Sequence, residues 1–144
     1  MHCLSTKLPW AMLIVAGRKT IEVRNWSGIG RARALIGERV AIHCGRSIAE
    51  DAPVDVRGLA FEVSGAWQAL RGAIIGSAVV TDAFWFTTET FVERQPEHLN
   101  PLEWWEDGLC GIEFGEPRRL DRPIPWRGEL GFFELPEAVG KRLG

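Results

Sequence analysis

Residues 17–26 carry the pattern that decides the fold, and they read Gly17-Arg18-Lys19-Thr20-Ile21-Glu22-Val23-Arg24-Asn25-Trp26. From Thr20 onward apolar and polar residues alternate, which is typical of a β-strand with one buried face. Ile21 and Val23 form the buried face. The presented face carries Thr20, Glu22, Arg24 and Trp26. An acid, a guanidinium and an indole in one row suit a flat ligand with negative charge or hydrogen-bonding edges, because the indole stacks and the guanidinium pairs.

The length and composition are those of one folded domain. The chain has 144 residues, of which 46% are hydrophobic and 25% charged, so it is long enough for one substantial core and short for two. Its apolar runs are too short to cross a bilayer, and we expect no membrane role. The apolar stretch at residues 11–16 lacks the flanks of a secretory signal and predicts a short buried helix.

Charge and cysteine usage narrow the function further. Cys3, Cys44 and Cys110 are odd in number and have no C-x-x-C spacing, so we expect neither a disulfide framework nor a metal site, and a cytoplasmic location. A net charge of −2 and a pI near 5.9 argue against a protein that coats long nucleic acid electrostatically. Any nucleic-acid site must be local. The sequence indicates no cofactor and leaves the oligomeric state open.

After a short start, the remaining chain predicts an α+β domain without βαβ alternation. The expected helices span residues 9–16, 59–70 and a short stretch from 136. The expected strands span 20–26, 39–44, 73–86, 110–114 and 129–135, with loops or turns at 27–30 and 123–126 and a long irregular segment, a lid or binding loop, at 94–108. Gly76 predicts a bend or a close backbone approach in the longest strand. If strands 20–26 and 39–44 share a core, His43 lies on the Arg24 side.

Four motifs in this order resemble those of ASCH domains, relatives of the PUA-type barrels that bind RNA. They are G-x-K-x-x-E-x-R at Gly17, Lys19, Glu22 and Arg24 after a helix with Pro9 and Trp10, then Ile42-His43-Cys44-Gly45, Gly72-Ala73-Ile74-Ile75-Gly76 and Pro123-Ile124-Pro125-Trp126-Arg127-Gly128. The resemblance covers nearly the whole chain. It implies a single domain over residues 1–144, a small mixed PUA-like β-barrel of about five or six strands flanked by short helices, and a cleft beside the motif strand for RNA, nucleotides or modified nucleosides.

The polar residues of this strand have a binding and a structural interpretation. For binding, Lys19 and Arg24 contact an anion or carbonyl, and Glu22, ionised between them, accepts from a base edge. A stacked tryptophan contributes on the order of 1–3 kcal/mol per base. In the structural interpretation, Glu22 and Arg24 form a surface ion pair worth roughly 0–1 kcal/mol, and the tryptophans fill the core. The candidate ligand-binding residues are Trp10, Lys19, Thr20, Glu22, Arg24, Trp26, His43 and Arg127, with Trp126 as a further stacking candidate.

Enzymatic chemistry is the first alternative. His43 titrates near neutral pH and suits a general base, although a lone strand histidine also suits a structural role. One branch resembles amidohydrolases of acylated cytidine that use the motif lysine and a threonine three positions later. Here Glu22 occupies that position, so this activity is not carried over. A ribonuclease or amidohydrolase-like enzyme would instead use Lys19, Glu22 and His43 as catalytic residues.

Arg127 and two further tryptophans complete the candidates. Arg127 stands beside a glycine at a strand start, from where it reaches a cleft without obstruction or else fixes a loop. Trp104 and Trp105 predict core or interface positions, and as an exposed pair they would favour a protein-interaction adaptor. The leading hypothesis is binding of RNA or a nucleotide-like ligand. A hydrolase using the same cleft and an adaptor are the alternatives.

Overall fold

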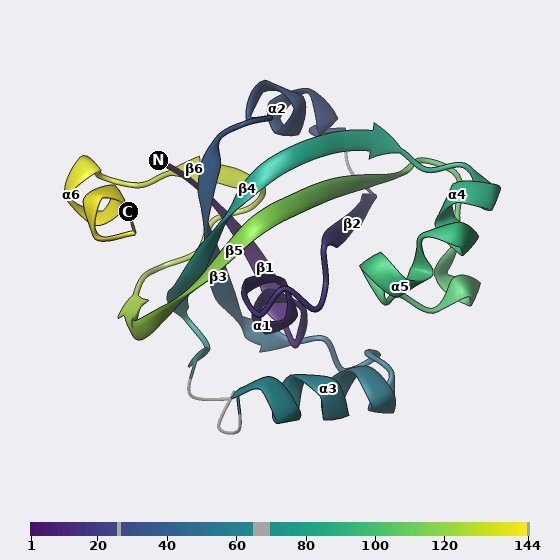
Figure 1. Cartoon of the computed structure of the whole chain (residues 1–144), viewed down its shortest axis with the longest axis horizontal. Coiled ribbons are helices and arrows are strands. Elements are labelled where there is room, and N and C mark those ends of the chain that lie inside the picture. Colours follow the sequence, from purple (N-terminus) through teal and green to yellow (C-terminus); the bar gives the residue numbers. More distant parts are fainter. Residues whose placement is uncertain (26, 65–69, 144) are drawn as a thin grey trace.

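The computed structural model describes residues 1–25, 27–64 and 70–143, and these form one sheet surrounded by short helices (Figure 1). Six strands of this part of the chain pair in the order β2-β5-β4-β3-β1-β6. The strands are β1 (His2–Leu8), β2 (Ile21–Asn25), β3 (Arg39–Ile48), β4 (Ala73–Trp85), β5 (Leu109–Pro125) and β6 (Phe132–Glu134). β1 runs parallel to β3, and the other pairs are antiparallel.

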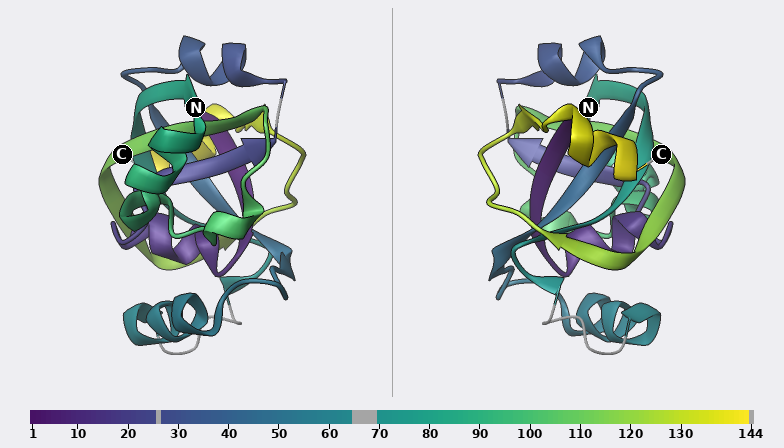
Figure 2. Two further views of the ribbon diagram at one scale, coloured as in Figure 1. Left: turned by 90° about the vertical axis from the view of Figure 1, so that its right-hand side faces the viewer. Right: turned by 90° about the vertical axis from the view of Figure 1, so that its left-hand side faces the viewer.

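The helices lie around the edges and inside the curl of the sheet. They are α1 (Trp10–Val15), α2 (Ile29–Ala34), α3 (Val54–Ser64), α4 (Thr88–Glu93), α5 (Gln95–His98) and α6 (Glu137–Arg142), with a 3-10 turn, η2, at Leu102–Trp104. α2 and α3 lie at opposite ends of the molecule in both figures (Figure 2). None of the helices in the described part is long and apolar enough to cross a membrane.

The sheet curls into a half-barrel. In the sheet order, three strands separate β1 from β2, yet the Thr6 hydroxyl of β1 donates a hydrogen bond of 2.7 Å to the Glu22 carboxylate of β2. A flat sheet would hold these strands far apart, since neighbouring strands are about 4.8 Å apart. All residues of α1 are buried, and α1 packs against β1, β3 and β4. This α+β architecture confirms the predicted barrel-like fold.

Glycines at two predicted positions behave as expected. Gly17 ends α1 with φ +75°, a conformation that glycine adopts without steric cost. At Gly76 in β4, a Cβ atom would lie 2.2 Å from the carbonyl oxygen of Arg118. The close backbone approach predicted for Gly76 is therefore present, and β4 spans almost the predicted range.

The N-terminal strand was not predicted. Residues 1–8, taken as a short start, contain β1, which lies between β3 and β6. Cys3 packs in the cluster on one face of β1, whereas Leu4 packs in the main cluster on the other. A strand that is buried on both faces need not alternate, and the polar residues His2, Ser5, Thr6 and Lys7 also interrupt a continuous apolar run. Neither strand pattern therefore marks this segment.

Several other boundaries also differ from the prediction. β5 continues to Pro125 through the expected turn, because it pairs with β4 as far as Ala73, and β3 and β6 differ in length from their expected ranges. α2 occupies part of the expected loop. Burial of Ile29 and Ala32 outweighs the low helix propensity of Gly30. α3 begins earlier than expected, and part of the predicted helix, residues 65–69, lies outside the described residues. α4, also unpredicted, begins with a capping box between Thr87 and Thr90.

Candidate functional site

A cavity of about 470 Å³ opens beside β2, where the curl of the sheet brings β2 close to β1. We call it the inner cavity, because Trp10 of α1 and the side chains of Thr6 and Glu22 line it. Its lining includes Thr6, Trp10, Glu22, Arg24, Arg46, Asn100 and Trp104. It contains two of the three charged groups of the G-x-K-x-x-E-x-R motif and two aromatic rings.

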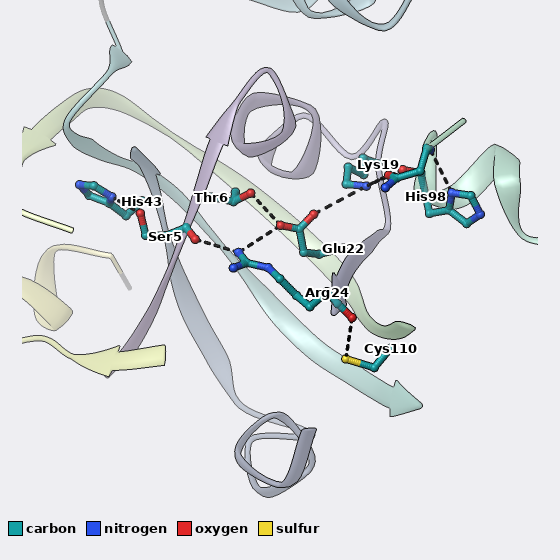
Figure 3. A network of polar contacts seen from close by, with 9 residues as sticks. Ser5, Thr6, Lys19, Glu22, Arg24, His43, His98 and Cys110 are labelled. Carbon is teal, nitrogen blue, oxygen red and sulfur yellow. Dashed lines mark hydrogen bonds and ion pairs between the residues drawn. The ribbon is translucent and has the colours of Figure 1, made fainter. Parts of the chain in front are cut away.

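The Glu22 carboxylate is held by three neighbours (Figure 3). Its Oε2 accepts hydrogen bonds from Thr6 Oγ1 at 2.7 Å and from Arg24 Nη2 at 3.1 Å, and its Oε1 lies 3.7 Å from Lys19 Nζ. Burial alone would raise the pKa of Glu22, but the charges of Arg24 and Lys19 and the Thr6 hydrogen bond outweigh it and lower the pKa. Glu22 is therefore ionised at neutral pH, as predicted.

Lys19 points into the protein and does not line the inner cavity. Its side chain is 0% exposed, and its Nζ donates to the carbonyl oxygen of His98 and, at 3.2 Å, to Oδ1 of Asn100. Nζ also lies 4.6 Å from the centroid of the Trp10 ring, within cation–π range. Burial lowers the pKa of Lys19 to about 8, although Glu22 opposes the shift, so the ammonium is charged at neutral pH.

Arg24 joins β2 to β1 and borders the inner cavity. Its Nη2 donates to the carbonyl oxygen of Ser5 at 2.8 Å and contacts Glu22. Within the described residues its other N–H groups have no hydrogen-bond partner. Since a guanidinium carries five N–H donors, Arg24 has donors left for a ligand in the cavity.

His43 lies on the opposite face of the sheet. Its Nε2 lies 2.7 Å from the carbonyl oxygen of Trp126 and must donate to it, which leaves Nδ1 to accept from Ser5 Oγ at 2.9 Å. Burial lowers the pKa of His43, so the imidazole is neutral at neutral pH. The expectation that His43 lies on the Arg24 side if the two strands share a core is wrong. His43 lies on the face of Ser5, its register partner on β1, whereas the next residue, Thr6, points to the other face and contacts Glu22.

A second cavity of about 800 Å³ lies on this opposite face, and we call it the outer cavity. It is lined by His43, Trp126 and Arg127 and shares Ser5 and Arg46 with the inner cavity. The predicted site residues that line a cavity are thus divided: Trp10, Glu22 and Arg24 line the inner cavity, and His43 and Arg127 line the outer one.

Of the remaining candidates only Trp104 lines a cavity, the inner one, and the others lie elsewhere or outside the described residues. Thr20 lines neither cavity, and its N–H donates to the carbonyl oxygen of Glu97 at 3.0 Å. Trp26 lies outside the described residues. Trp104 packs edge-on against Trp10 with centroids 6.3 Å apart, and Trp105 packs against Phe91 at 5.4 Å. Both rings are half-buried rather than fully displayed.

Four residues that the sequence did not single out also shape the site: Ser5, Thr6, Arg46 and Asn100. Ser5 and Thr6 belong to the unpredicted β1, so no sequence pattern marked them. Asn100 lies between α5 and η2, in the segment 94–108 that was expected to be irregular and for which a binding loop was one of the two predicted roles. That prediction was the only local signal for any of the four.

Within the described residues, no group of three or more His, Cys, Asp or Glu side chains could hold a metal ion. Cys3, Cys44 and Cys110 are buried and form no disulfide. The groups beside β2 that line the inner cavity are the Glu22 carboxylate, the Arg24 guanidinium, the Asn100 amide and the indoles of Trp10 and Trp104.

Comparisons with known proteins agree with this architecture. The crystal structure of ASCH from Zymomonas mobilis superimposes with a TM-score of 0.64 at 14% identity and covers 99% of this chain and 92% of that chain. A tyrosine-to-phenylalanine mutant of the same protein gives 0.63 at 14% identity, with 99% and 94% covered.

A third structure, the N-terminal domain of Staphylothermus marinus McrB, has a TM-score of 0.51 at 9% identity and covers 99% of this chain and 91% of that chain. No curated protein matches the sequence. The sequence model of the ASCH domain matches residues 4–118. This span runs from within β1 to within β5 and includes Thr6, Lys19 and Arg24, the residues that contact Glu22. This chain therefore belongs to the ASCH domain family.

Proposed function

We propose that this protein binds RNA or a nucleotide-like ligand in the inner cavity. One observation carries the proposal: a cavity of about 470 Å³ holds an ionised carboxylate and a guanidinium beside two tryptophans. Small-molecule sites typically measure about 300–1,000 Å³ and combine aromatic walls with a few placed polar groups. The family is usually linked to RNA binding, which agrees with these features.

Each polar group has a role that suits a nucleobase. Oε1 of Glu22 lies 3.7 Å from Lys19 Nζ, which is too long for a hydrogen bond, so this oxygen can accept from a base amine. Asn100 turns Oδ1 toward Lys19, and its Nδ2 is consequently a donor for a base carbonyl or ring nitrogen. Trp104 lines the same cavity and offers a face for stacking.

The electrostatics favour recognition over hydrolysis. A general base works best when its pKa lies near the operating pH, whereas the charges of Arg24 and Lys19 keep the pKa of Glu22 low. Lys19, the expected oxyanion partner, is buried and occupied by His98 and Asn100. His43, the other expected base, belongs to the outer cavity. Glu22 is therefore better suited to accept hydrogen bonds than to remove protons.

The proposal predicts that Trp104→Ala weakens ligand binding. We expect calorimetric titration with the four ribonucleoside 5′-monophosphates and a random-sequence RNA tetranucleotide to detect binding to the unmodified protein. Loss of a stacked indole should lower the affinity about tenfold or more. Trp85→Ala is the matched control, because Trp85 is 47% exposed and lines neither cavity.

Glu22→Gln provides the second arm of this test. It retains the side-chain shape but removes the charged acceptor, and should also lower the affinity by about tenfold. Because this variant leaves the buried Lys19 without its anion, its fold must be checked by thermal unfolding. The proposal is wrong if no probe binds, or if folded Trp104→Ala and Glu22→Gln both bind as tightly as the unmodified protein.

A further inference from the structure

The outer cavity adjoins the inner cavity across one shared wall, formed by Ser5, Gly45, Arg46, Glu129 and Leu130. We infer that the outer cavity is a second subsite, which holds the phosphate and the neighbouring nucleotide of a single-stranded oligonucleotide whose first base occupies the inner cavity. This inference rests on the proposed function. It adds that the ligand is at least a dinucleotide, since a mononucleotide would bring no second base to Trp126 of the outer cavity.

Charge distinguishes the two cavities. Three acidic and three basic side chains line the inner cavity, and their charges balance: Lys7, Glu22, Arg24, Arg46, Asp51 and Glu129. The outer cavity has Arg46 and Arg127 against Glu129 alone, which leaves it one positive charge in excess. The neutral edge of a base therefore suits the inner cavity, and a phosphate suits the outer one.

The two arginines of the outer cavity are available to an anion. Within the described part of the chain, neither Arg46 nor Arg127 forms an ion pair or a hydrogen bond through its side chain. Arg46 lies against Gly72, where a Cβ atom would come within 3.1 Å of Arg46 Nε and where φ is +73°. Gly72 thus leaves space for Arg46 in the wall common to both cavities, where a phosphate linking two nucleotides would lie.

Trp126 offers a fixed aromatic surface on the far side of Arg46. Its N–H donates to the carbonyl oxygen of Gly72 at 3.0 Å, and its own carbonyl oxygen accepts from His43 at 2.7 Å. The indole is half-buried, packs against the cluster around Ile124 and lines the outer cavity. Because both backbone groups of Trp126 are held, stacking a second base here requires little additional ordering.

Ser5 connects the two subsites through one strand. Its carbonyl oxygen accepts from Arg24 at 2.8 Å, and its hydroxyl donates to His43 at 2.9 Å (Figure 3). The spacing between the Glu22 and His43 groups is consequently set by a paired strand rather than by loops. Leu130 in the shared wall is 99% exposed, and an oligonucleotide that crosses this wall would cover it.

The test compares ligands of different length on matched arginine variants. The probes are a fluorescently labelled random-sequence RNA tetranucleotide, the same sequence set as DNA, and unlabelled nucleoside monophosphates as competitors. We expect the tetranucleotide to bind at least about tenfold more tightly than any monophosphate, because a second stacked base adds on the order of 1–3 kcal/mol. Equal affinity for the RNA and DNA tetranucleotides would indicate that the protein contacts bases and phosphate only. Tighter binding of RNA would indicate a further contact to the 2′-hydroxyl.

Arg127→Gln should weaken tetranucleotide binding several-fold and reduce the slope of log affinity against log salt by about 0.7, the value for one lost phosphate contact on a single strand. It should leave monophosphate binding unchanged. Arg122→Gln is the matched control, because Arg122 is exposed on β5 and lines neither cavity. Trp126→Leu should weaken the tetranucleotide selectively in the same way, with thermal unfolding as a check on its fold.

The result that overturns the second subsite is a tetranucleotide affinity equal to that of a monophosphate, or one that Arg127→Gln and folded Trp126→Leu both leave unchanged. If Trp104→Ala still weakens binding in that case, the proposed function stands without the outer cavity. If neither the tetranucleotide nor any monophosphate binds, the proposed function fails, and the subsite fails with it.

Discussion

Lys19 shows how a motif residue can act on the protein rather than on a ligand. Its buried ammonium contacts the carbonyl of His98, the side chain of Asn100 and Glu22. It therefore orders the segment after α5 and helps to keep Glu22 ionised, but it does not reach the inner cavity. A ligand in the inner cavity would therefore be affected by Lys19 only indirectly, through Glu22 or Asn100.

Lys19→Met should change how stability depends on pH. The pKa of Lys19 is lowered from 10.5 to about 8 in the folded protein, so between these values the unfolded chain binds more protons than the folded one. The contribution of Lys19 to the free energy of unfolding, taken as the difference between the unmodified protein and Lys19→Met, should therefore rise with pH in this window by on the order of 1–3 kcal/mol.

Urea unfolding at pH 7.5 and pH 10 measures this difference. Lys141→Met serves as a control for the loss of one positive charge, because Lys141 is exposed on α6. Equal pH dependence in Lys19→Met and the unmodified protein would show that the buried ammonium does not titrate in this range.

At the scale of elements, the close approach of β4, β5 and α1 determines where the site can form. At Gly76 of β4, a Cβ atom would lie 2.2 Å from the Arg118 carbonyl oxygen and 2.7 Å from Cγ1 of Val15. Three elements therefore meet at one missing side chain. α1 is followed along the chain by Gly17 and then by β2. The packing of α1 against the sheet therefore also positions Glu22 and Arg24 of β2.

Gly76→Ala should consequently destabilise the fold by about 1–3 kcal/mol or more, since the added methyl group clashes with backbone that cannot move away. Gly58→Ala is the matched control, because Gly58 lies within α3 and a Cβ atom there meets nothing within 4 Å. Alanine at this helical position should stabilise by roughly 0.5–1 kcal/mol. Urea unfolding of both variants measures the difference, and a Gly76→Ala protein as stable as Gly58→Ala would contradict the close approach.

At the scale of the whole molecule, three buried titratable groups act on stability in the same direction. Burial lowers the pKa of His43 and of His98. The pKa of Glu22 is also lowered, because the charges of Arg24 and Lys19 outweigh the opposing effect of burial. Below their usual pKa values, the unfolded chain takes up protons that the folded protein resists. Stability therefore falls on acidification in two stages, through the two histidines and then through Glu22.

As the pH is lowered from neutral, the melting temperature should fall below about pH 6.5, where the histidines of the unfolded chain protonate. It should fall further below about pH 4.5, where Glu22 of the unfolded chain protonates. His43→Gln should show a smaller decrease between pH 7 and pH 5 than the unmodified protein, because one of the two titrating imidazoles is removed. Thermal unfolding at four pH values measures both curves. Parallel curves in this interval would exclude His43 from the first stage.

Much of the fold could be predicted from local patterns. Gly17 marked the end of α1, alternation from Thr20 onward marked β2, and β-branched residues marked β4. β1 could not be predicted, because it is buried on both faces, and β5 was shortened because Pro123 and Pro125 resemble turn residues. Trp104 was identified as packed, but its place in the cavity wall depends on the contact with Trp10.

For the site, the sequence alone determined the chemistry: it places an acid and a guanidinium two residues apart on one strand face, and alternation makes Glu22 and Arg24 neighbours in any sheet. The tertiary structure decided which partners they meet. The curl of the sheet brings Thr6 and Ser5 of β1 to β2, and Lys19 is turned inward to buried partners. His43 of β3 lies on the same face as Ser5, its register partner on β1, and therefore in a separate cavity. These contacts join residues distant in sequence, and no local pattern encodes the path by which a sheet closes on itself.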